Sequence, residues 1–343
     1  MAKKHKNLFD KIACFDSLLS AFYQVRKGKR KSKAVLLFEL NLEDNLFDLV
    51  TELQSRRYRL NEYCQFKVYE PKERLIRTLP IRDRVVQRAI HDVLYPIYNK
   101  MFIDDSYACR KYKGTHAGAD RVTMYIRQLE KTGKIVYCLK CDIHKYFYSI
   151  DREVLKGIIK RKIGCEGTLW LLSLILDSSP EEIGIPLGNL TSQLFANIYL
   201  NELDQHVKHC LKKRFYIRYM DDFLILSNNK AELAETKLQI EIFLQERLGL
   251  LLNHKTQIFP VGPRAVDFLG YRIYPQYRLL RNDSKKRFKK KVKLFQTLYR
   301  QGDMDWSAIR SSIHSWIGHC SHANTYSLRR HALKDIYFSR HKS

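Results

Sequence analysis

Two adjacent aspartates, Asp221 and Asp222, interrupt a strongly apolar stretch that runs from Phe215 to Ser227 (FYIRYMDDFLILS). The residues on either side of the pair are typical of β-strands, so the stretch predicts a hairpin with the two acids at its tip. Neighbouring carboxylates in apolar surroundings are costly unless a cation neutralises them. The pattern therefore indicates either a metal-binding pair or a pair of exposed turn acids.

A third acid, Asp142, ends another apolar segment, in which residues 134–140 (KIVYCLK) predict a buried strand. Phosphoryl transfer needs two divalent cations about 4 Å apart, held by carboxylates. Mg²⁺ takes oxygen ligands, so a few acids at strand ends are the pattern that this chemistry requires. The pair Asp104-Asp105 has no apolar strand after it, and we expect it to be an exposed loop pair.

The chain is strongly basic: 62 Lys and Arg against 36 Asp and Glu give a net charge of +26 over 343 residues. Such a charge favours a polyanionic partner, and 45% hydrophobic residues exclude a globally disordered chain. The charge is concentrated in residues 1–33 and 278–300. In the second run Phe288, Val292 and Phe295 recur at helical spacing, which predicts a helix with one packed face and one basic face. The basic face is either a nucleic-acid contact or simply solvated.

Strand-like and helix-like segments are mixed along the chain, which predicts an α+β fold. Helices are expected over Thr191–Val207 and Ala231–Leu248, and strand structure over Val266–Tyr274. No apolar run approaches the roughly 20 residues of a membrane span, and the N-terminus lacks the apolar segment of a secretion signal. We therefore expect a cytoplasmic protein with no membrane partner, whose eight cysteines stay reduced.

These segments, in their order along the chain, resemble the conserved blocks of reverse transcriptases. Lys72, Arg74 and Asp83–Gln87 match the block that contacts the incoming triphosphate, and Asp142, with Phe147 five positions later, matches the first catalytic block. Gly188–Gln193 match the turn and helix that follow. Tyr219-Met-Asp-Asp222 match the Y-x-D-D box, and Val266–Gly270 match the primer-grip hairpin. The ordered set is far more specific than the Y-x-D-D box alone.

The resemblance implies an α+β right-hand polymerase with fingers, a palm of antiparallel sheet and helices, and a helical thumb. A basic N-terminal extension would span residues 1–34 and the fingers 35–134. The palm would span 135–276, with its motif blocks around 142, 188 and 221 and the primer grip at 266–274. The helical thumb would take 277–343.

The implied activity is RNA-directed DNA polymerisation with two Mg²⁺ ions, for which Mn²⁺ is a substitute. Asp142, Asp221 and Asp222 are the implied catalytic acids and metal ligands, together with the backbone carbonyl of Ile143. Lys255 resembles a lysine that protonates the departing pyrophosphate, although it could equally be a surface lysine.

The resemblance also assigns residues to the deoxynucleoside triphosphate. Lys72 and Arg74 would bind its phosphates, unless they belong to a solvated basic loop. Phe147 resembles the steric gate that excludes a 2′-hydroxyl, the alternative being an ordinary core residue. Leu187 and Gly188 would lie at the nascent base pair.

A further group of residues would contact the RNA template and the DNA or RNA primer. For Ser192 and Gln193 the alternative is simple helix capping. The complete set is Ser192, Gln193, Tyr219, Met220, Leu269, Gly270, Lys286 and Lys290.

Within the family, two departures resemble the enzymes of diversity-generating retroelements: the apolar Leu187 before Gly188, and Ser192-Gln193 in place of Ser-Pro. This subtype implies a template-repeat RNA and an accessory variability protein as partners, misincorporation at template adenines, and diversification of a target gene. Alternatives are a reverse transcriptase of an antiphage defence system, a retron or a group II intron lineage. A non-catalytic RNA-binding protein on the same fold is the alternative from a different class.

Overall fold

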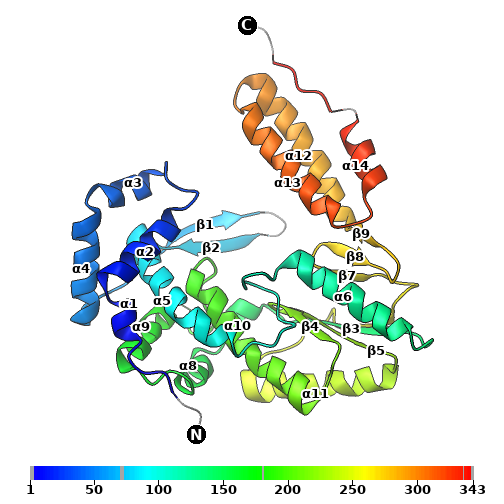
Figure 1. The fold of residues 1–343 in the computed structure, drawn as a ribbon, viewed down its shortest axis with the longest axis horizontal. Coiled ribbons are helices and arrows are strands. Elements are labelled where there is room, and N and C mark those ends of the chain that lie inside the picture. Colours follow the sequence, from blue (N-terminus) through cyan, green and yellow to red (C-terminus); the bar gives the residue numbers. More distant parts are fainter. Residues whose placement is uncertain (1–3, 70–72, 180, 335, 341–343) are drawn as a thin grey trace.

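The structure is a computed structural model that describes residues 4–69, 73–179, 181–334 and 336–340 (Figure 1). Its first part contains α1 (Phe9–Ile12), α2 (Phe15–Arg26), α3 (Lys33–Leu40), α4 (Leu42–Gln54), β1 (Cys64–Val68), β2 (Arg74–Thr78), α5 (Ile81–Asn99) and α6 (Thr115–Glu130). The middle contains β3 (Tyr137–Asp142), α7 (Tyr146–Ser149), α8 (Arg152–Lys160), α9 (Glu166–Asp177), α10 (Leu190–Gln205), a π-helical turn (His206–Cys210), β4 (Tyr216–Tyr219), β5 (Asp222–Ser227), α11 (Lys230–Leu248) and β6 (Gln257–Pro260). The last part contains β7 (Val266–Phe268), β8 (Tyr271–Ile273), β9 (Arg278–Leu280), α12 (Asn282–Gln301), α13 (Trp306–Ser321) and α14 (Tyr326–Leu333). Within these described ranges, no helix is both long and apolar enough to cross a membrane.

The strands form antiparallel sheets, which confirms the predicted α+β class. The central sheet has the order β4-β5-β3-β6, and β7-β8-β9 form a smaller sheet beside it. The hairpin β1-β2 stands apart from both. The segment 266–274, expected to be strand, is two strands joined by a tight turn.

Each face of the central sheet is buried in its own apolar core, because alternate residues of a strand point to opposite faces. Leu139 and Phe223 belong to the core formed with α5 and α8–α11, whereas Leu224 belongs to the core formed with α6 and β7–β9. Cys138 and Cys141 are three residues apart on β3 and fall in different cores, and burial raises the pKa of both thiols. This C-x-x-C pair therefore cannot chelate one ion.

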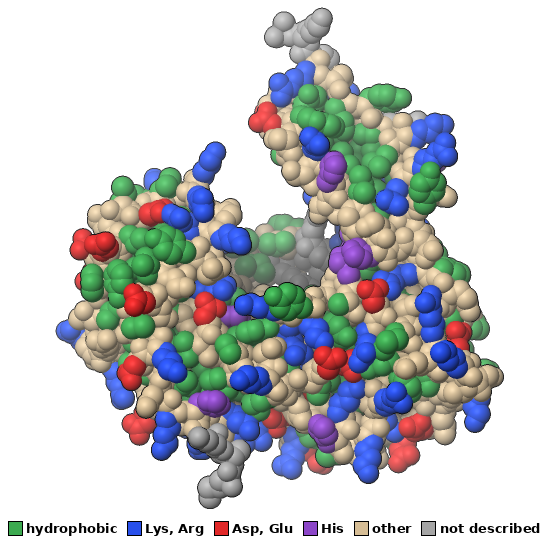
Figure 2. Space-filling view, viewed as in Figure 1, with side chains coloured by type: hydrophobic (Ala, Val, Ile, Leu, Met, Phe, Trp, Pro, Cys, Tyr) green, Lys and Arg blue, Asp and Glu red, His purple; other side chains and the backbone are tan. Residues whose placement is uncertain are grey.

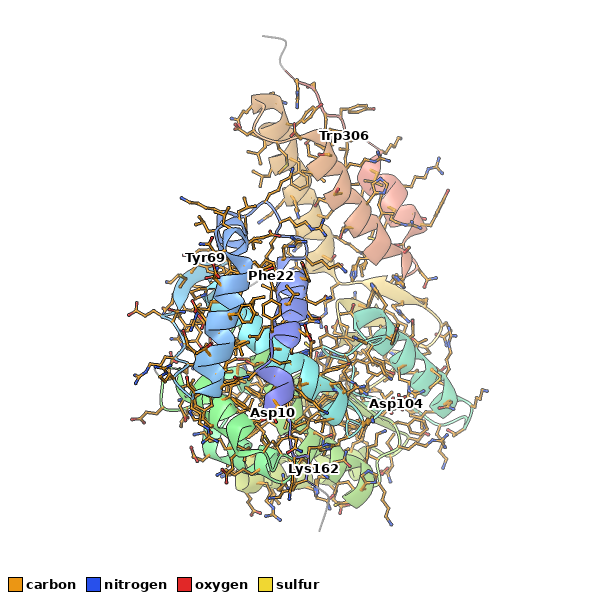
Figure 3. All side chains as sticks on the ribbon, turned by 60° about the vertical axis from the view of Figure 1, so that its left-hand side comes forward. Asp10, Phe22, Tyr69, Asp104, Lys162 and Trp306 are labelled. Carbon is orange, nitrogen blue, oxygen red and sulfur yellow. The ribbon has the colours of Figure 1, made fainter. Side chains whose placement is uncertain are left out.

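The basic N-terminal segment is integrated into the fold. Ile12, Leu18 and Phe22 are fully buried in the main core, and Figure 3 shows Phe22 among the N-terminal helices. By contrast, the lysine-rich loop 27–33 is exposed. The charge run of this region is therefore one solvated edge of a packed helical unit and not a loose tail.

Helices α12–α14 form an arm that projects from the smaller sheet (Figure 1). The predicted packed face of α12 is confirmed: Phe288, Val292 and Phe295 are buried, and the Phe288 ring stacks on Trp316 at 3.7 Å between centroids. Trp306, labelled in Figure 3, packs edge-on against Phe338 farther along the arm. Figure 2 shows the molecular surface hollowed between this arm and the N-terminal helices.

A glycine allows the turn before α10 to lie directly against β2. Gly188 has φ +122°, and a Cβ there would lie 2.1 Å from the carbonyl oxygen of Arg77. The Arg77 amide donates to the carbonyl of Leu187 at 2.9 Å, so the two backbones are in direct contact. Only a residue without a side chain fits this approach.

We expect Gly188→Ala to lower the free energy of unfolding by about 2–3 kcal/mol, because the methyl group meets backbone and the φ angle is strained. Gly157→Ala is the matched control, since no atom lies within 4 Å of its Cβ position inside α8. That substitution should stabilise by about 0.5–1 kcal/mol. Urea unfolding of both variants measures the difference, and equal effects would contradict the assignment.

Candidate active site

The predicted acidic hairpin is confirmed. Tyr219 pairs with Asp222 across β4 and β5, which leaves Met220 and Asp221 as a two-residue turn. Met220 has φ +57°, a left-handed conformation that is unfavourable for a residue with a side chain. Arg218 stabilises this turn, because its Nη1 donates to the Met220 carbonyl at 3.0 Å.

Three acids from two distant parts of the sequence meet at this hairpin. Asp142, the last residue of β3, lies directly opposite Asp222, the first residue of β5. Side chains directly opposite each other in an antiparallel pair have Cβ atoms about 4.5–5.5 Å apart. Asp221 precedes Asp222 in the turn, so the structure brings together all three predicted catalytic acids.

The acids repel one another, and Asp222 shows the effect most clearly. Its pKa is raised to about 6: burial is the largest cause, the charges of Asp142 and Asp221 add to it, and the nearby Lys140 acts in the opposite direction. The Asp222 side chain is 26% exposed, and its buried Oδ1 has no hydrogen-bond partner. A second cation beside these carboxylates would relieve the repulsion.

The donor set fits a divalent metal ion by its chemistry. Carboxylate oxygens are the ligands that Mg²⁺ prefers, and the partnerless Oδ1 of Asp222 is a buried acceptor. In the conformation that the structure describes, no three His, Cys, Asp or Glu side chains of the described ranges are placed to hold one ion.

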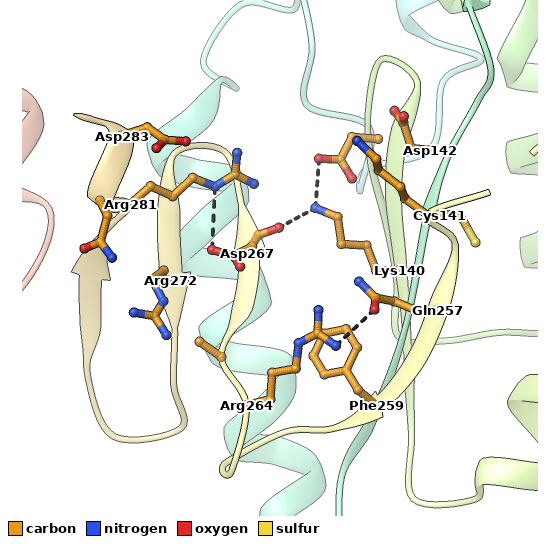
Figure 4. Close-up of a pocket in the computed structure, with 14 residues that line it drawn as sticks. Lys140, Cys141, Asp142, Gln257, Phe259, Arg264, Asp267, Arg272, Arg281 and Asp283 are labelled. Atoms are coloured by element: carbon orange, nitrogen blue, oxygen red, sulfur yellow. Dashed lines mark hydrogen bonds and ion pairs between the residues drawn. The ribbon is translucent and has the colours of Figure 1, made fainter. Parts of the chain in front are cut away.

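Asp142 is fixed by the segment that follows α11. The Asn253 side chain donates to Asp142 Oδ2 at 3.1 Å, and the Asn253 amide donates to the Asp142 carbonyl at 2.7 Å. Lys255, two residues later, is exposed and lines a cavity of about 650 Å³ with Asp142 and Asp222 (Figure 4). Ile143 is buried beside this segment, bridged to Leu252.

Three of the residues expected at the nucleotide, Phe147, Leu187 and Gly188, lie in or beside the loop 184–189. The Ile185 amide donates to the carbonyl of Phe147 at 2.8 Å, and Leu187 bonds to β2 through Arg77. Phe147 is half-buried and contacts the Tyr146 ring edge-on at 5.5 Å, so it is accessible on one side. The loop thus contacts Phe147 on one side and, through Leu187 and Gly188, β2 on the other. Arg74 is the first residue of β2, whereas Lys72 lies outside the described residues.

The residues expected along the nucleic acid are more dispersed. On α10, Gln193 is exposed but Ser192 is buried, with 2% of its surface accessible. Leu269 and Gly270 form the β7-β8 turn with φ angles of +52° and +87°. Tyr219 and Met220 lie in the acidic hairpin, half-buried. Lys286 and Lys290 are exposed on α12, in the arm.

The expectation of an exposed pair at Asp104-Asp105 is half wrong. The segment is a loop and the side chain of Asp104 is 73% exposed, but Asp105 is buried. Asp105 accepts hydrogen bonds from Tyr125 at 2.6 Å and from Arg121 at 2.7 Å. Lys208 of the π-helical turn also donates to it at 3.0 Å. Asp105 is thus a structural anion with partners on α6 and on this turn, contacts that no local pattern indicates.

Sequence reasoning missed the residues that hold the acids in place: Lys140, Asp204, Arg218 and Asn253. For two of these residues, the sequence contains a pattern that could have indicated their role. Arg218 is a charged residue in the middle of a predicted buried strand, which requires a buried partner. Lys140 precedes Asp142 by two positions, so both side chains lie on one face of β3.

We expect Asp222→Asn to stabilise the metal-free protein at pH 7 by about 1–3 kcal/mol. The pKa of Asp222 is about 6 in the folded protein against an ordinary value of 3.8, so the folded state binds this proton more tightly. The unfolding free energy of the unaltered protein should therefore fall between about pH 4 and pH 6, and this part of the fall should be missing in the variant. Urea unfolding across that range in the presence of a chelator measures the difference, and identical pH profiles would rule the interpretation out.

Comparison with known proteins agrees with this geometry. Residues 67–273, more than half of the chain, match the family described as reverse transcriptase (RNA-dependent DNA polymerase). The chain is 28% identical over 253 residues to protein YkfC of Escherichia coli (strain K12), which covers 60% of this chain and 66% of that protein. It is 22% identical over 304 residues to the group II intron-encoded protein LtrA of Lactococcus lactis subsp. cremoris, a match that covers 67% of this chain and 50% of that protein. The chain thus spans about half to two thirds of the length of these relatives.

Solved structures show the same fold. Apo telomerase from Candida tropicalis superposes with a TM-score of 0.53 at 13% identity, over 80% of this chain and 58% of that one. The same telomerase in complex with a fragment of telomeric RNA superposes with a TM-score of 0.51 at 14% identity, over 84% of this chain and 57% of that one. With the family match over residues 67–273, the chain belongs to the reverse transcriptase family and is distantly related to group II intron proteins.

Proposed function

We propose that this protein is an RNA-directed DNA polymerase that adds deoxynucleotides to a primer 3′-hydroxyl on an RNA template. The observation that carries the proposal is the pairing of Asp142 with Asp222 across β3 and β5, beside Asp221 in the turn. Family membership supports the same reaction. The basic charge of the chain suits a nucleic-acid substrate.

In this proposal Asp142, Asp221 and Asp222, with the carbonyl of Ile143, hold two Mg²⁺ ions. When bound, the metal ions lower the pKa of the attacking hydroxyl and stabilise the charge on the leaving phosphates. The chain itself fixes the acids: Asn253 orients Asp142, and Arg218 holds the turn that carries Asp221. Lys255 is placed beside the same cavity and would protonate the departing pyrophosphate.

The loop 184–189 would receive the incoming nucleotide. Phe147, accessible on one side, would lie under its sugar and exclude a 2′-hydroxyl, while Arg74 of β2 and Lys72 would contact its phosphates. Gln193 is the exposed member of the predicted pair on α10 and is the better candidate for a template contact than the buried Ser192. The β7-β8 turn would hold the primer end, and Lys286 and Lys290 would contact the duplex backbone from the arm, as a thumb does.

Asp221→Ala should reduce primer extension on an RNA template by about 10³-fold or more, because a metal ligand at the reacting phosphate is lost. Asp104→Ala is the matched control, since Asp104 is an exposed loop acid outside the site. Extension of a labelled primer by purified protein, with its RNA partner present, measures both. Full activity of Asp221→Ala would exclude the proposed chemistry.

Among reverse transcriptases, we propose an enzyme of a diversity-generating retroelement, acting with a template-repeat RNA and an accessory variability protein. Leu187 supports this subtype. Its backbone is pinned to β2 beside Gly188, and its apolar side chain cannot hydrogen-bond to a base pair as glutamine would. Mispairs would then lose less stabilisation relative to correct pairs.

Leu187→Gln should lower the error rate at template adenines, because the amide would favour correctly shaped pairs by about 1 kcal/mol, or roughly fivefold. Sequencing cDNA made from an adenine-rich RNA gives the error spectrum. Leu187→Met keeps an apolar side chain of similar size and should leave the spectrum unchanged. An adenine error rate for Leu187→Gln equal to that of the unaltered enzyme would refute this role.

The similarity to LtrA favours a second candidate, a reverse transcriptase of the group II intron lineage. The two candidates differ in their genomic surroundings. A variable repeat, a template repeat and an accessory gene beside this gene would support the retroelement, whereas flanking intron RNA sequence would support the intron lineage.

A further inference from the structure

Lys140 lies between the acid set and the smaller sheet. On β3 the even-numbered residues Cys138, Lys140 and Asp142 share one face, which looks toward the core of β7–β9. On β5 the same face carries Asp222 together with Leu224. The Lys140 side chain is 19% exposed, so most of it is withdrawn from water.

The ammonium group of Lys140 has two partners on different elements (Figure 4). Its Nζ lies 3.4 Å from Asp222 Oδ2 and also donates to the backbone carbonyl of Asp267 on β7. Because an ammonium group has three protons and no acceptor, it can satisfy both oxygens at once. Lys140 thus joins the catalytic sheet to the first strand of the hairpin proposed to grip the primer.

The connection continues into the arm. The carboxylate of Asp267 lies 3.6 Å from Arg281 Nε, and the Arg281 amide donates to the Gly270 carbonyl at 3.1 Å. Arg281 is the N-cap residue of α12. A chain of polar contacts therefore runs from Asp222 through Lys140 and β7 to the first residue of the arm.

Two other cations that line this cavity have different partners. Arg264 donates to Gln257 at 3.0 Å and lies over the Phe259 ring at 4.4 Å, while Arg281 faces Asp267. In the described part of the chain, the cation in contact with Asp222 is Lys140. The acid therefore depends on one lysine for its charge compensation from the protein.

We propose that Lys140 is a positioning residue that fixes one oxygen of Asp222 and ties the acid set to the β7-β8 hairpin, so that the catalytic acids and the primer end move as one unit. The inference rests on the proposed function for its meaning in catalysis. The contacts of Lys140 with Asp222 and Asp267 do not depend on that function. With Oδ2 held by Lys140, the partnerless Oδ1 is the oxygen of Asp222 left for a divalent cation, which makes Asp222 a one-oxygen ligand.

A double-mutant cycle on stability in the presence of EDTA tests the link to Asp222. Lys140→Met keeps the length of the side chain but removes its charge, and should lower the melting temperature by about 5 °C or more, since it leaves a largely buried carboxylate without its partner. In the Asp222→Asn background the same substitution should cost less than half as much. Equal losses in both backgrounds would overturn the proposed pairing.

Hydrogen exchange of the amides in residues 266–273 tests the link to the hairpin. Lys140→Met should speed this exchange about tenfold, and Asp222→Asn should not restore it, because the contact with the Asp267 carbonyl is lost in either background. Lys134→Met, at an exposed lysine before β3, is the control and should change neither readout. Unchanged exchange in Lys140→Met would overturn the link to the hairpin.

Lys140→Gln keeps the cycle interpretable if Lys140→Met fails to fold. Glutamine retains a donor for the Asp267 carbonyl but no charge, so it should lower the melting temperature while leaving the exchange within about twofold of the unaltered protein. None of these readouts uses polymerase activity. Failure of the Lys140 proposal is therefore distinguishable from failure of the proposed reaction, which primer extension tests separately.

Discussion

A fully buried ion pair between Asp204 of α10 and Arg218 of β4 determines how the acidic hairpin is held. Neither side chain is exposed, and the guanidinium makes two hydrogen bonds to the carboxylate, at 2.6 and 2.7 Å. The Tyr216 hydroxyl donates to the same carboxylate at 2.7 Å, and Arg218 also bonds to Asn197 and Ser106. Breaking such a pair typically costs about 3–5 kcal/mol, because the remaining charge is left without compensation. Since Arg218 also holds the Met220 carbonyl, the left-handed turn before Asp221 is stabilised by the same buried group.

This pair makes α10 the element that relates the two halves of the candidate site. The helix begins at Leu190, just after the Gly188 turn, and carries Asp204 near its other end, about 21 Å away at 1.5 Å per residue. At its first end, backbone contact with β2 places the loop proposed for the nucleotide. At its far end, the ion pair places the hairpin that carries the acids. An almost wholly buried helix thus sets the distance between the loop proposed for the nucleotide and the acids proposed to bind metal, so a change in core packing along it would reach both.

The sequence was sufficient to predict the parts of the site that depend on local pattern. Two apolar runs around Asp221 and Asp222 indicated the hairpin, and the strand before Asp142 was placed to within a few residues. The pairing of Asp142 with Asp222 could be expected only from the family resemblance, because strand order depends on tertiary packing. The partners of the buried charges were not predictable either: Asp105 meets Arg121, and Arg218 meets Asp204, through contacts that no periodicity encodes. The N-terminal helices were missed for a related reason, since their charge run obscured Ile12, Leu18 and Phe22, which are buried.

Charge is organised on two length scales in this molecule. The net charge of +26 attracts a polyanion from a distance, although salt screens this attraction beyond about 8 Å at physiological ionic strength. Within the site the balance is different: three carboxylates converge, and Lys140 compensates one oxygen of one of them. The acids would otherwise repel the phosphates of an approaching primer. Partial compensation by a lysine that also contacts the β7-β8 hairpin leaves the site acidic enough for the proposed divalent cations, while the basic charge elsewhere suits the proposed nucleic-acid substrate. A chain this basic can therefore keep an acidic centre because the acids are half-buried and only part of their charge is compensated locally, by Lys140.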